Sequence, residues 1–165
     1  MKIKLLGTMN KALFLDLDGT VIITKSGRAF PLHSDDWKLI PEMLPFIKEK
    51  IKQNYIPIIV TNQAGIELGY LTEQTFINKI ENICYRLEYY LKIPKNTINY
   101  WYCKEAESYN RKPNIGMAIQ AAEEYELNFS ECIMVGDMES DKEFARNCGM
   151  TYISVEKILT NAQGL

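Results

Sequence analysis

A short apolar run that ends in acid and glycine constrains this chain more than any other feature. Residues 11–16 read KALFLD, and the chain continues directly into Asp18 and Gly19. Such a run, bounded by a turn signal, is typical of a buried central strand that stops at a loop. The carboxylates of Asp16 and Asp18 would then lie close together at the strand end. They repel each other unless a cation or a proton lies between them.

Further segments with strand and helix patterns predict the fold class. Four have the composition of strands: 56–61, 131–136, 97–102 and 151–155. Four have apolar residues at helical spacing: 42–53, a segment capped by Thr72, 114–125, and 140–148 followed by Gly149. Strands that alternate with helices predict an α/β fold, in which a Rossmann-like parallel sheet carries helices on both faces in three layers.

Length and composition predict one domain over residues 1–165. The net charge of −2 means that nucleic acid would be attracted only by a local basic cluster. No apolar run approaches a membrane span or a signal peptide, so we expect a soluble, intracellular monomer without membrane contact. Four cysteines lack the spacing of zinc sites or disulfide frameworks and are expected to be free thiols: Cys84, Cys103, Cys132 and Cys148.

Carboxylates also follow a later apolar run, at Asp137 and Asp141. The carboxyl ends of parallel strands form the ligand-binding edge of such a sheet, so Asp16, Asp18, Asp137 and Asp141 are expected to meet there. Oxygen ligands of this kind suit Mg²⁺. Each pair alone has another interpretation, because the first pattern occurs in turns and calcium loops and the second at acidic helix starts. A calcium loop needs further oxygen ligands, whereas residues 21–23 are apolar.

Two other polar motifs are candidates for the same edge. Thr61, Asn62 and Gln63 follow the strand at 56–61 and offer a hydroxyl and backbone N–H groups. Arg111 and Lys112 offer paired cations just before a helix. Taken singly, the first motif is also compatible with a simple turn, and the second with solvated surface charge.

In order along the chain, these motifs resemble the four motifs of the haloacid dehalogenase superfamily. They are DLDGT at 16–20, TNQ at 61–63, RKP at 111–113 and GDMESD at 136–141. The resemblance covers roughly residues 11–155 and implies a Mg²⁺-dependent phosphatase. It implies that Asp16 attacks phosphorus to form an aspartyl-phosphate, and that Asp18 acts as general acid and base.

The resemblance also implies roles for the remaining motif residues. Asp16, the Asp18 carbonyl and Asp137 would hold Mg²⁺, with Asp141 in support. Lys112 would add a second positive charge, the Thr61 hydroxyl and the Asn62 backbone N–H would bind phosphoryl oxygens, and Arg111 would bind substrate. The spacing between motifs leaves room for a small hairpin flap but for no large cap domain.

The segment TKSGRAFP at 24–31 indicates the substrate. It predicts a hairpin turned at Ser26 and Gly27 that places Lys25 and Arg28 near the site, with Trp37 as an aromatic anchor. A surface hairpin with Trp37 packed on the core is the alternative. The segment is similar to the 3′-phosphatase domain of polynucleotide kinase/phosphatase, which implies removal of 3′-phosphate from DNA ends, a DNA-repair reaction.

Histidinol-phosphate and heptose-bisphosphate phosphatases are the main alternative, because they share the last three motifs. They characteristically carry a zinc-binding Cys/His loop before RKP, whereas residues 99–110 contain only Cys103, and the single histidine, His33, lies elsewhere. We therefore expect no structural zinc and favour a polynucleotide end as the substrate. A catalytically silent binding module is a third possibility, which the complete set of motif residues disfavours.

Overall fold

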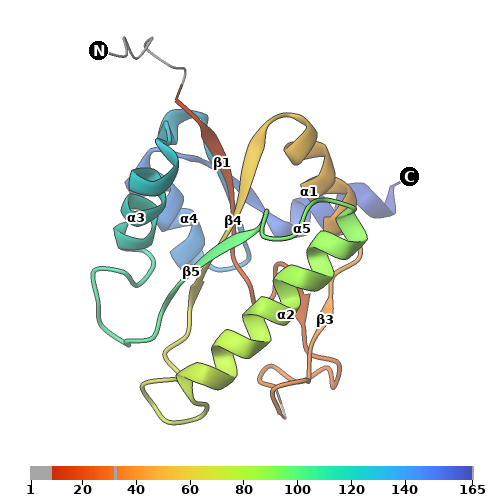
Figure 1. Cartoon of the computed structure of the whole chain (residues 1–165), viewed down its shortest axis with the longest axis vertical. Helices are drawn as coiled ribbons and strands as arrows, with labels where there is room; N and C mark the ends of the chain where they lie inside the picture. Colours follow the sequence, from red (N-terminus) through yellow and green to blue (C-terminus); the bar gives the residue numbers. More distant parts are fainter. Residues whose placement is uncertain (1–8, 32, 165) are drawn as a thin grey trace.

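A five-stranded parallel sheet forms the middle layer of the computed structural model, which describes residues 9–31 and 33–164. Its strands are β1 (Lys11–Leu15), β4 (Tyr55–Asn62), β5 (Asn99–Cys103), β6 (Ile133–Gly136) and β7 (Thr151–Ser154). The spatial order is β5-β4-β1-β6-β7, with β1 in the centre (Figure 1). In register, Leu13 of β1 lies between Pro57 of β4 and Ile133 of β6.

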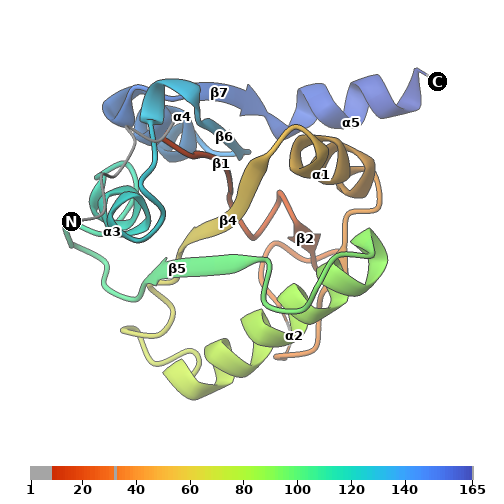
Figure 2. The same ribbon diagram turned by 45° about the horizontal axis from the view of Figure 1, so that its top comes forward.

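Helices cover both faces of this sheet, as Figure 2 shows. One face carries α1 (Met43–Lys52), α2 (Glu73–Leu91) and α5 (Val155–Gln163); the other carries α3 (Gly116–Tyr125) and α4 (Glu139–Cys148). A short 3₁₀ helix, Phe129–Glu131, precedes β6. The predicted three-layer α/β class is therefore confirmed. In the described ranges, no helix is long and apolar enough to span a membrane.

Side-chain alternation along β1 explains why two cores form. Leu13 and Leu15 belong to the cluster under α1, α2 and α5, whereas Ala12 and Phe14 belong to the cluster under α3 and α4. Successive strand residues point to opposite faces, so a strand buried on both sides must be apolar throughout. Residues 12–15, ALFL, are buried and meet this requirement, whereas Lys11 at the start of the strand is only partly buried, and the strand ends just before Asp16.

Local signals place most element ends correctly. The Thr72 hydroxyl accepts a hydrogen bond from Thr75 N at 3.1 Å and starts α2, and Gly149 ends α4 with φ of 75°. Helix α5 was not predicted, and Val155, expected at the end of the last strand, is instead its first residue. Valine suits a buried strand as well as a helix start, so the sequence pattern does not separate the two.

The predicted hairpin exists, but its turn was placed wrongly. Strands β2 (Ile22–Ile23) and β3 (Lys38–Leu39) pair antiparallel, so they are joined by a long loop, described at residues 24–31 and 33–37, rather than by a tight turn at residues 26 and 27. Asp36 holds this flap, because its carboxylate accepts from Ser26 N at 2.8 Å and Ser26 Oγ at 2.6 Å. Trp37 is 8% exposed and packs in the core, as the alternative interpretation expected. No separate cap domain stands over the sheet within the described residues.

Candidate active site

Asp16, Asp137 and Asp141 meet at the carboxyl edge of β1 and β6. These strands are parallel neighbours, and Asp16 N donates to Val135 O at 2.9 Å. Each of the three aspartates offers a carboxylate oxygen, and these oxygens lie within 4.8 Å of one another. Asp16 and Asp141 are buried, whereas Asp137 is exposed and leaves the group open to solvent on one side.

Lys112 joins the two buried carboxylates. Its Nζ donates to Asp16 Oδ1 at 2.7 Å, to Asp141 Oδ1 at 2.6 Å and to the carbonyl of Val60 at 2.8 Å. These three contacts satisfy all three donors of the ammonium group. The side chain is only 2% exposed, so water is largely excluded from it. A cation held in this way fixes the orientation of Asp16 and offsets its charge.

The side chain of Asn62 positions the backbone of Lys112. Asn62 Nδ2 donates to the Lys112 carbonyl at 2.9 Å, and Lys112 N donates to Asn62 Oδ1 at 3.0 Å. This paired contact joins the end of β4 to a loop fifty residues away in the chain. The sequence analysis considered only the backbone N–H of Asn62, so this side-chain role is an addition to it.

Asp18 is held by two side chains that carried no role in the sequence analysis. Gln63 Nε2 donates to Asp18 Oδ2 and to Thr61 Oγ1, both at 2.9 Å. Lys79 Nζ of α2 lies 3.9 Å from Asp18 Oδ1, and the Lys79 side chain is only 9% exposed. Lys79 lies between Phe76 and Ile83 on the apolar stripe of α2. A lysine on an apolar stripe is the sequence signal that could have indicated its role beside Asp18.

Burial dominates the electrostatics of the cluster. It raises the pKa of Asp16 to about 7; the positive charge of Lys112 opposes this rise, and the negative charge of Asp141 adds to it. Burial and the charge of Asp141 likewise raise the pKa of Asp137. Burial lowers the pKa of Lys112, but the charges of Asp16 and Asp141 outweigh it and the net shift is upward. The cluster therefore favours an added cation.

Two glycines allow the catalytic loops to approach this closely. Gly19 has φ of 79°, and a Cβ there would overlap the Asp137 carboxylate. A Cβ at Gly136 would overlap Asp141. Any larger residue at position 19 would therefore meet both backbone strain and a clash with a candidate metal ligand.

The donor chemistry of the cluster fits a hard divalent cation. The three side chains offer only carboxylate oxygens, which Mg²⁺ prefers, and they include neither sulfur nor imidazole. The Asp18 side chain is outside this group, and its expected role as a metal ligand through the backbone carbonyl stays a prediction. In the part of the chain that the structure describes, no Cys/His group with zinc-ligand geometry occurs, and Cys103 is buried beside Glu105.

The remaining predicted site residues lie at different distances from this centre. Arg111 precedes Lys112, and its Nη1 is buried without a hydrogen-bond partner among the described residues. Lys25 and Arg28 lie on the flap; neither side chain makes a hydrogen bond or ion pair with the catalytic carboxylates within residues 9–31 and 33–164. Lys25 instead lines a groove beside Trp37 and Arg86.

Comparison with known proteins assigns this site to a family. Residues 11–159 match the profile of the family described as polynucleotide kinase 3 phosphatase. This chain belongs to that family. It is also similar to a D-glycero-beta-D-manno-heptose-1,7-bisphosphate 7-phosphatase from Helicobacter pylori, with 33% identity over 138 residues that cover 81% of this chain and 76% of the relative.

Solved structures agree that this family member belongs to the haloacid dehalogenase superfamily. A protein from Mesorhizobium loti described as a had-like phosphatase has 25% identity and a TM-score of 0.74, covering 87% of this chain and 71% of its own. The D,D-heptose 1,7-bisphosphate phosphatase of B. bronchiseptica, solved with magnesium and phosphate, has a TM-score of 0.74 at 23% identity, covering 92% of this chain and 86% of its own. The second match shows a shared fold.

The chain is thus a haloacid dehalogenase phosphatase, as its motifs predicted. Its substrate is a separate matter, because the family description names a polynucleotide phosphatase whereas the Helicobacter relative is named for a sugar bisphosphate. The relatives therefore favour the sugar-bisphosphate alternative more than the sequence analysis did. The missing zinc loop is the sequence feature that favours the polynucleotide alternative.

Proposed function

We propose that this phosphatase hydrolyses phosphomonoesters through an aspartyl-phosphate on Asp16. A carboxylate oxygen of Asp16 attacks phosphorus, and the bond from phosphorus to the ester oxygen breaks. The contact that carries this proposal is Lys112, whose Nζ bridges Asp16 and Asp141 at 2.7 and 2.6 Å. It holds the nucleophile in one orientation and places a positive charge where the phosphoryl group would arrive.

Asp18 transfers the protons in both steps. It gives its proton to the departing alcohol oxygen, then takes a proton from the water whose oxygen attacks phosphorus, and inorganic phosphate and free Asp16 result. Gln63, donating to Asp18 Oδ2 at 2.9 Å, positions this carboxyl group for both transfers. Thr61 and Asn62, at the end of β4, are proposed to bind phosphoryl oxygens through the hydroxyl and the backbone N–H.

Mg²⁺ is the proposed cofactor, held by Asp16, Asp137 and the Asp18 carbonyl, with Asp141 in support. When bound, it supplies Lewis-acid stabilisation of phosphoryl charge and reduces repulsion between the phosphate and the carboxylates. Three carboxylate oxygens within 4.8 Å of one another support this proposal. The magnesium and phosphate of the B. bronchiseptica phosphatase, which shares the fold, agree with it.

As the substrate we propose first a sugar bisphosphate of the heptose type. The support is the 33% identity to the Helicobacter pylori heptose-1,7-bisphosphate 7-phosphatase over most of both chains. If this holds, the chain works without a Cys/His zinc loop, since Cys103 is the only thiol in residues 99–110.

A 3′-phosphorylated polynucleotide end is the second candidate substrate. The family profile over residues 11–159 supports it, as does the flap, described at residues 24–31 and 33–37, with its cations Lys25 and Arg28. The site has no cap domain above it in the described ranges, so a long strand could approach it.

One assay separates these candidates. Phosphate release is measured from heptose bisphosphate, histidinol phosphate, a 3′-phosphorylated oligonucleotide and a 5′-phosphorylated oligonucleotide, with the Asp16→Asn variant as the blank. We expect kcat/KM to be highest for heptose bisphosphate. Preference for the 3′-phosphorylated strand would replace the first candidate by the second, and release equal to the blank on every substrate would reject the catalytic proposal itself.

A further inference from the structure

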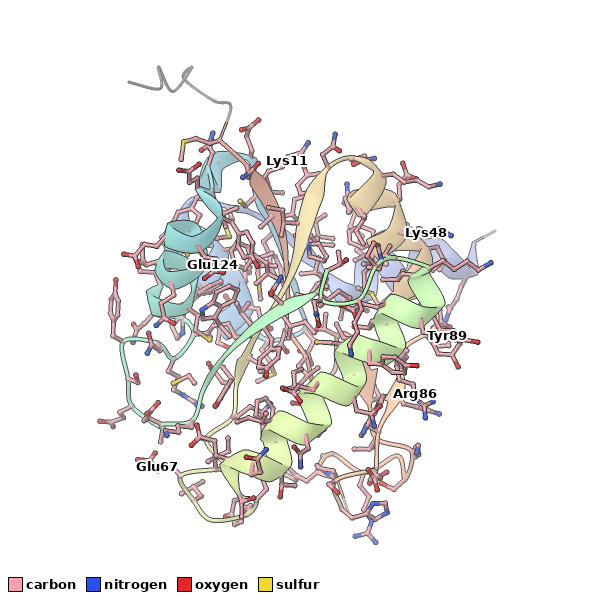
Figure 3. All side chains as sticks on the ribbon, in the orientation of Figure 1. Lys11, Lys48, Glu67, Arg86, Tyr89 and Glu124 are labelled. Atoms are coloured by element: carbon pink, nitrogen blue, oxygen red, sulfur yellow. The ribbon has the colours of Figure 1, made fainter. Side chains whose placement is uncertain are left out.

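A groove outside the catalytic cluster lies between the flap, the start of α1 and the second half of α2. Its volume is about 370 Å³, within the roughly 300–1,000 Å³ of ordinary small-ligand sites. The flap contributes Lys25 and Trp37, β3 contributes Lys38, and α2 contributes Arg86 and Tyr90. Figure 3 shows Arg86 projecting from α2 on the side where β3 lies.

Charge in this groove has one sign. Lys25, Lys38 and Arg86 are its charged lining residues, and no acidic side chain lines it among the described residues. A neighbouring groove that α2 also borders contains Glu81, Glu88 and Lys95, so positive charge is specific to the first. In a chain with net charge of −2, a hollow with three cations and no acid among its described lining residues indicates an anionic ligand.

Between these cations the groove is apolar and aromatic. Arg86 Cζ lies 6.0 Å from the ring centroid of Trp37, which fixes the guanidinium over the indole. Tyr90 is 53% exposed and packs edge-to-face with Tyr89 at 5.5 Å between ring centroids, and Leu44 adds an aliphatic wall. Cations next to an exposed aromatic ring are the combination that binds the phosphates and bases of a single strand.

Helix α2 connects this groove to the catalytic edge. Lys79 reaches within 3.9 Å of Asp18, and Arg86 follows it by seven residues on the same helix face. Seven residues of α-helix span about 10 Å. A stacked strand advances about 3.4 Å per nucleotide, so roughly three nucleotides would cover this distance.

We propose that the groove is a nucleotide subsite, which takes the third or fourth nucleotide of a strand whose 3′-phosphate lies at Asp16. The phosphodiester contacts Lys38 and Arg86, and the base packs on Tyr90. This inference rests on the polynucleotide candidate for the function. A planar base offers Tyr90 a larger stacking surface than a sugar ring does, so the groove favours a nucleotide over a distal sugar phosphate.

The test is the dependence of turnover on strand length. 3′-Phosphorylated oligonucleotides of one to six nucleotides are compared on the parent enzyme and on Lys38→Gln/Arg86→Gln. In the parent, kcat/KM rises at three to four nucleotides. In the double variant the ratio of six-nucleotide to one-nucleotide kcat/KM falls by about tenfold. The slope of log binding constant against log salt flattens by about 0.7 per lost contact.

A matched control removes the same charge elsewhere. Lys95→Gln/Arg146→Gln takes one lysine and one arginine from outside the groove, and its length dependence should equal that of the parent. Equal length profiles in the parent and in Lys38→Gln/Arg86→Gln would overturn the subsite. So would a loss in that variant confined to heptose bisphosphate, which would assign the groove to a second sugar phosphate.

Binding without turnover separates failure of the subsite from failure of the proposed function. A fluorescent six-nucleotide strand with a 3′-hydroxyl, which cannot be hydrolysed, is titrated by anisotropy. Binding that Lys38→Gln/Arg86→Gln weakens supports the groove even if the enzyme turns over only sugar phosphates. Absence of binding to the parent overturns the groove while leaving phosphatase activity on other substrates intact.

Discussion

At the scale of single residues, Lys112 and Gln63 position the two carboxylates to which we propose different catalytic roles, Asp16 and Asp18. Lys112 is buried against Asp16, and Gln63 bridges Asp18 and Thr61 in a more exposed place. A nucleophile must be held still and shielded from water, whereas an acid–base group must exchange protons with water. The difference in burial between Asp16 and Asp18 therefore follows from their different proposed tasks.

Replacing each carboxylate by its amide should separate these tasks. Asp16→Asn is expected to abolish turnover with the fold intact, because an amide cannot form the acyl-phosphate. Asp18→Asn keeps the nucleophile but loses the general acid and base, so kcat should fall by at least about a hundredfold. Steady-state kinetics and circular dichroism check both. Turnover by Asp16→Asn at the parent's rate would contradict the mechanism.

Gln63 is expected to act through Asp18 rather than on the substrate. Gln63→Leu should lower kcat by about tenfold for esters of poorly acidic alcohols and much less for p-nitrophenyl phosphate, whose leaving group needs little protonation. A purely structural role would lower kcat equally for both esters. Gln74→Leu, at an exposed glutamine of α2, is the matched control.

At the scale of elements, signals confined to a few neighbouring residues were predicted well, and long-range contacts were not. The apolar runs of β1, β4 and β6 and the cap at Thr72 need only local sequence. The flap was misplaced because its loop is set by Asp36 bonding Ser26 ten residues away. The side-chain contact of Asn62 with Lys112 spans fifty residues, so no local pattern reveals it.

Glu88 is another long-range contact, and it joins α2 to the chain entering β5. This residue is 5% exposed, and its Oε1 accepts from Thr97 N at 2.9 Å and from Ile98 N at 3.0 Å. Glu88→Leu leaves both amides without their acceptor and should lower the free energy of unfolding by about 2–4 kcal/mol. Urea unfolding measures this loss.

Two further variants test that interpretation. Glu88→Gln keeps one acceptor oxygen, so it should lower the free energy of unfolding by about half as much as Glu88→Leu does. Glu124→Leu, at an exposed glutamate of α3, should change stability by no more than about 0.5 kcal/mol. Equal losses for Glu88→Leu and Glu124→Leu would show that the two amides find other partners.

At the scale of the whole molecule, the fold collects negative charge at one edge of the sheet. Asp16 follows β1, Asp137 follows β6, and Asp141 lies in the first turn of α4; buried Lys112 links Asp16 to Asp141. The strand pattern predicted this convergence, because parallel strands end at a common edge. The pattern could not predict that Lys112 would bind both Asp16 and Asp141, since these contacts depend on how the loop before α3 packs.

This convergence predicts that Mg²⁺ both activates the enzyme and stabilises its fold. Chelation should abolish turnover and Mg²⁺ should restore it. The melting temperature should rise with Mg²⁺ concentration. At a concentration of a hundred times the dissociation constant, the free energy of unfolding should be about 2.7 kcal/mol higher than without Mg²⁺. Elemental analysis should find no stoichiometric zinc, and tightly bound zinc that survives chelation would contradict the carboxylate site.

Asp137→Asn provides a sharper form of the same prediction, because it removes one like charge from the cluster. Without metal, this variant should melt above the parent, since repulsion of Asp137 by Asp141 contributes to the raised pKa of Asp137. With Mg²⁺ the order should reverse, because the parent gains binding energy that the variant largely lacks. Glu139 is an exposed acid on α4 outside the cluster. The melting temperature of Glu139→Gln should therefore rise with Mg²⁺ as much as that of the parent. Melting curves of Asp137→Asn that stay above those of the parent at every Mg²⁺ concentration would mean that Asp137 does not hold the metal.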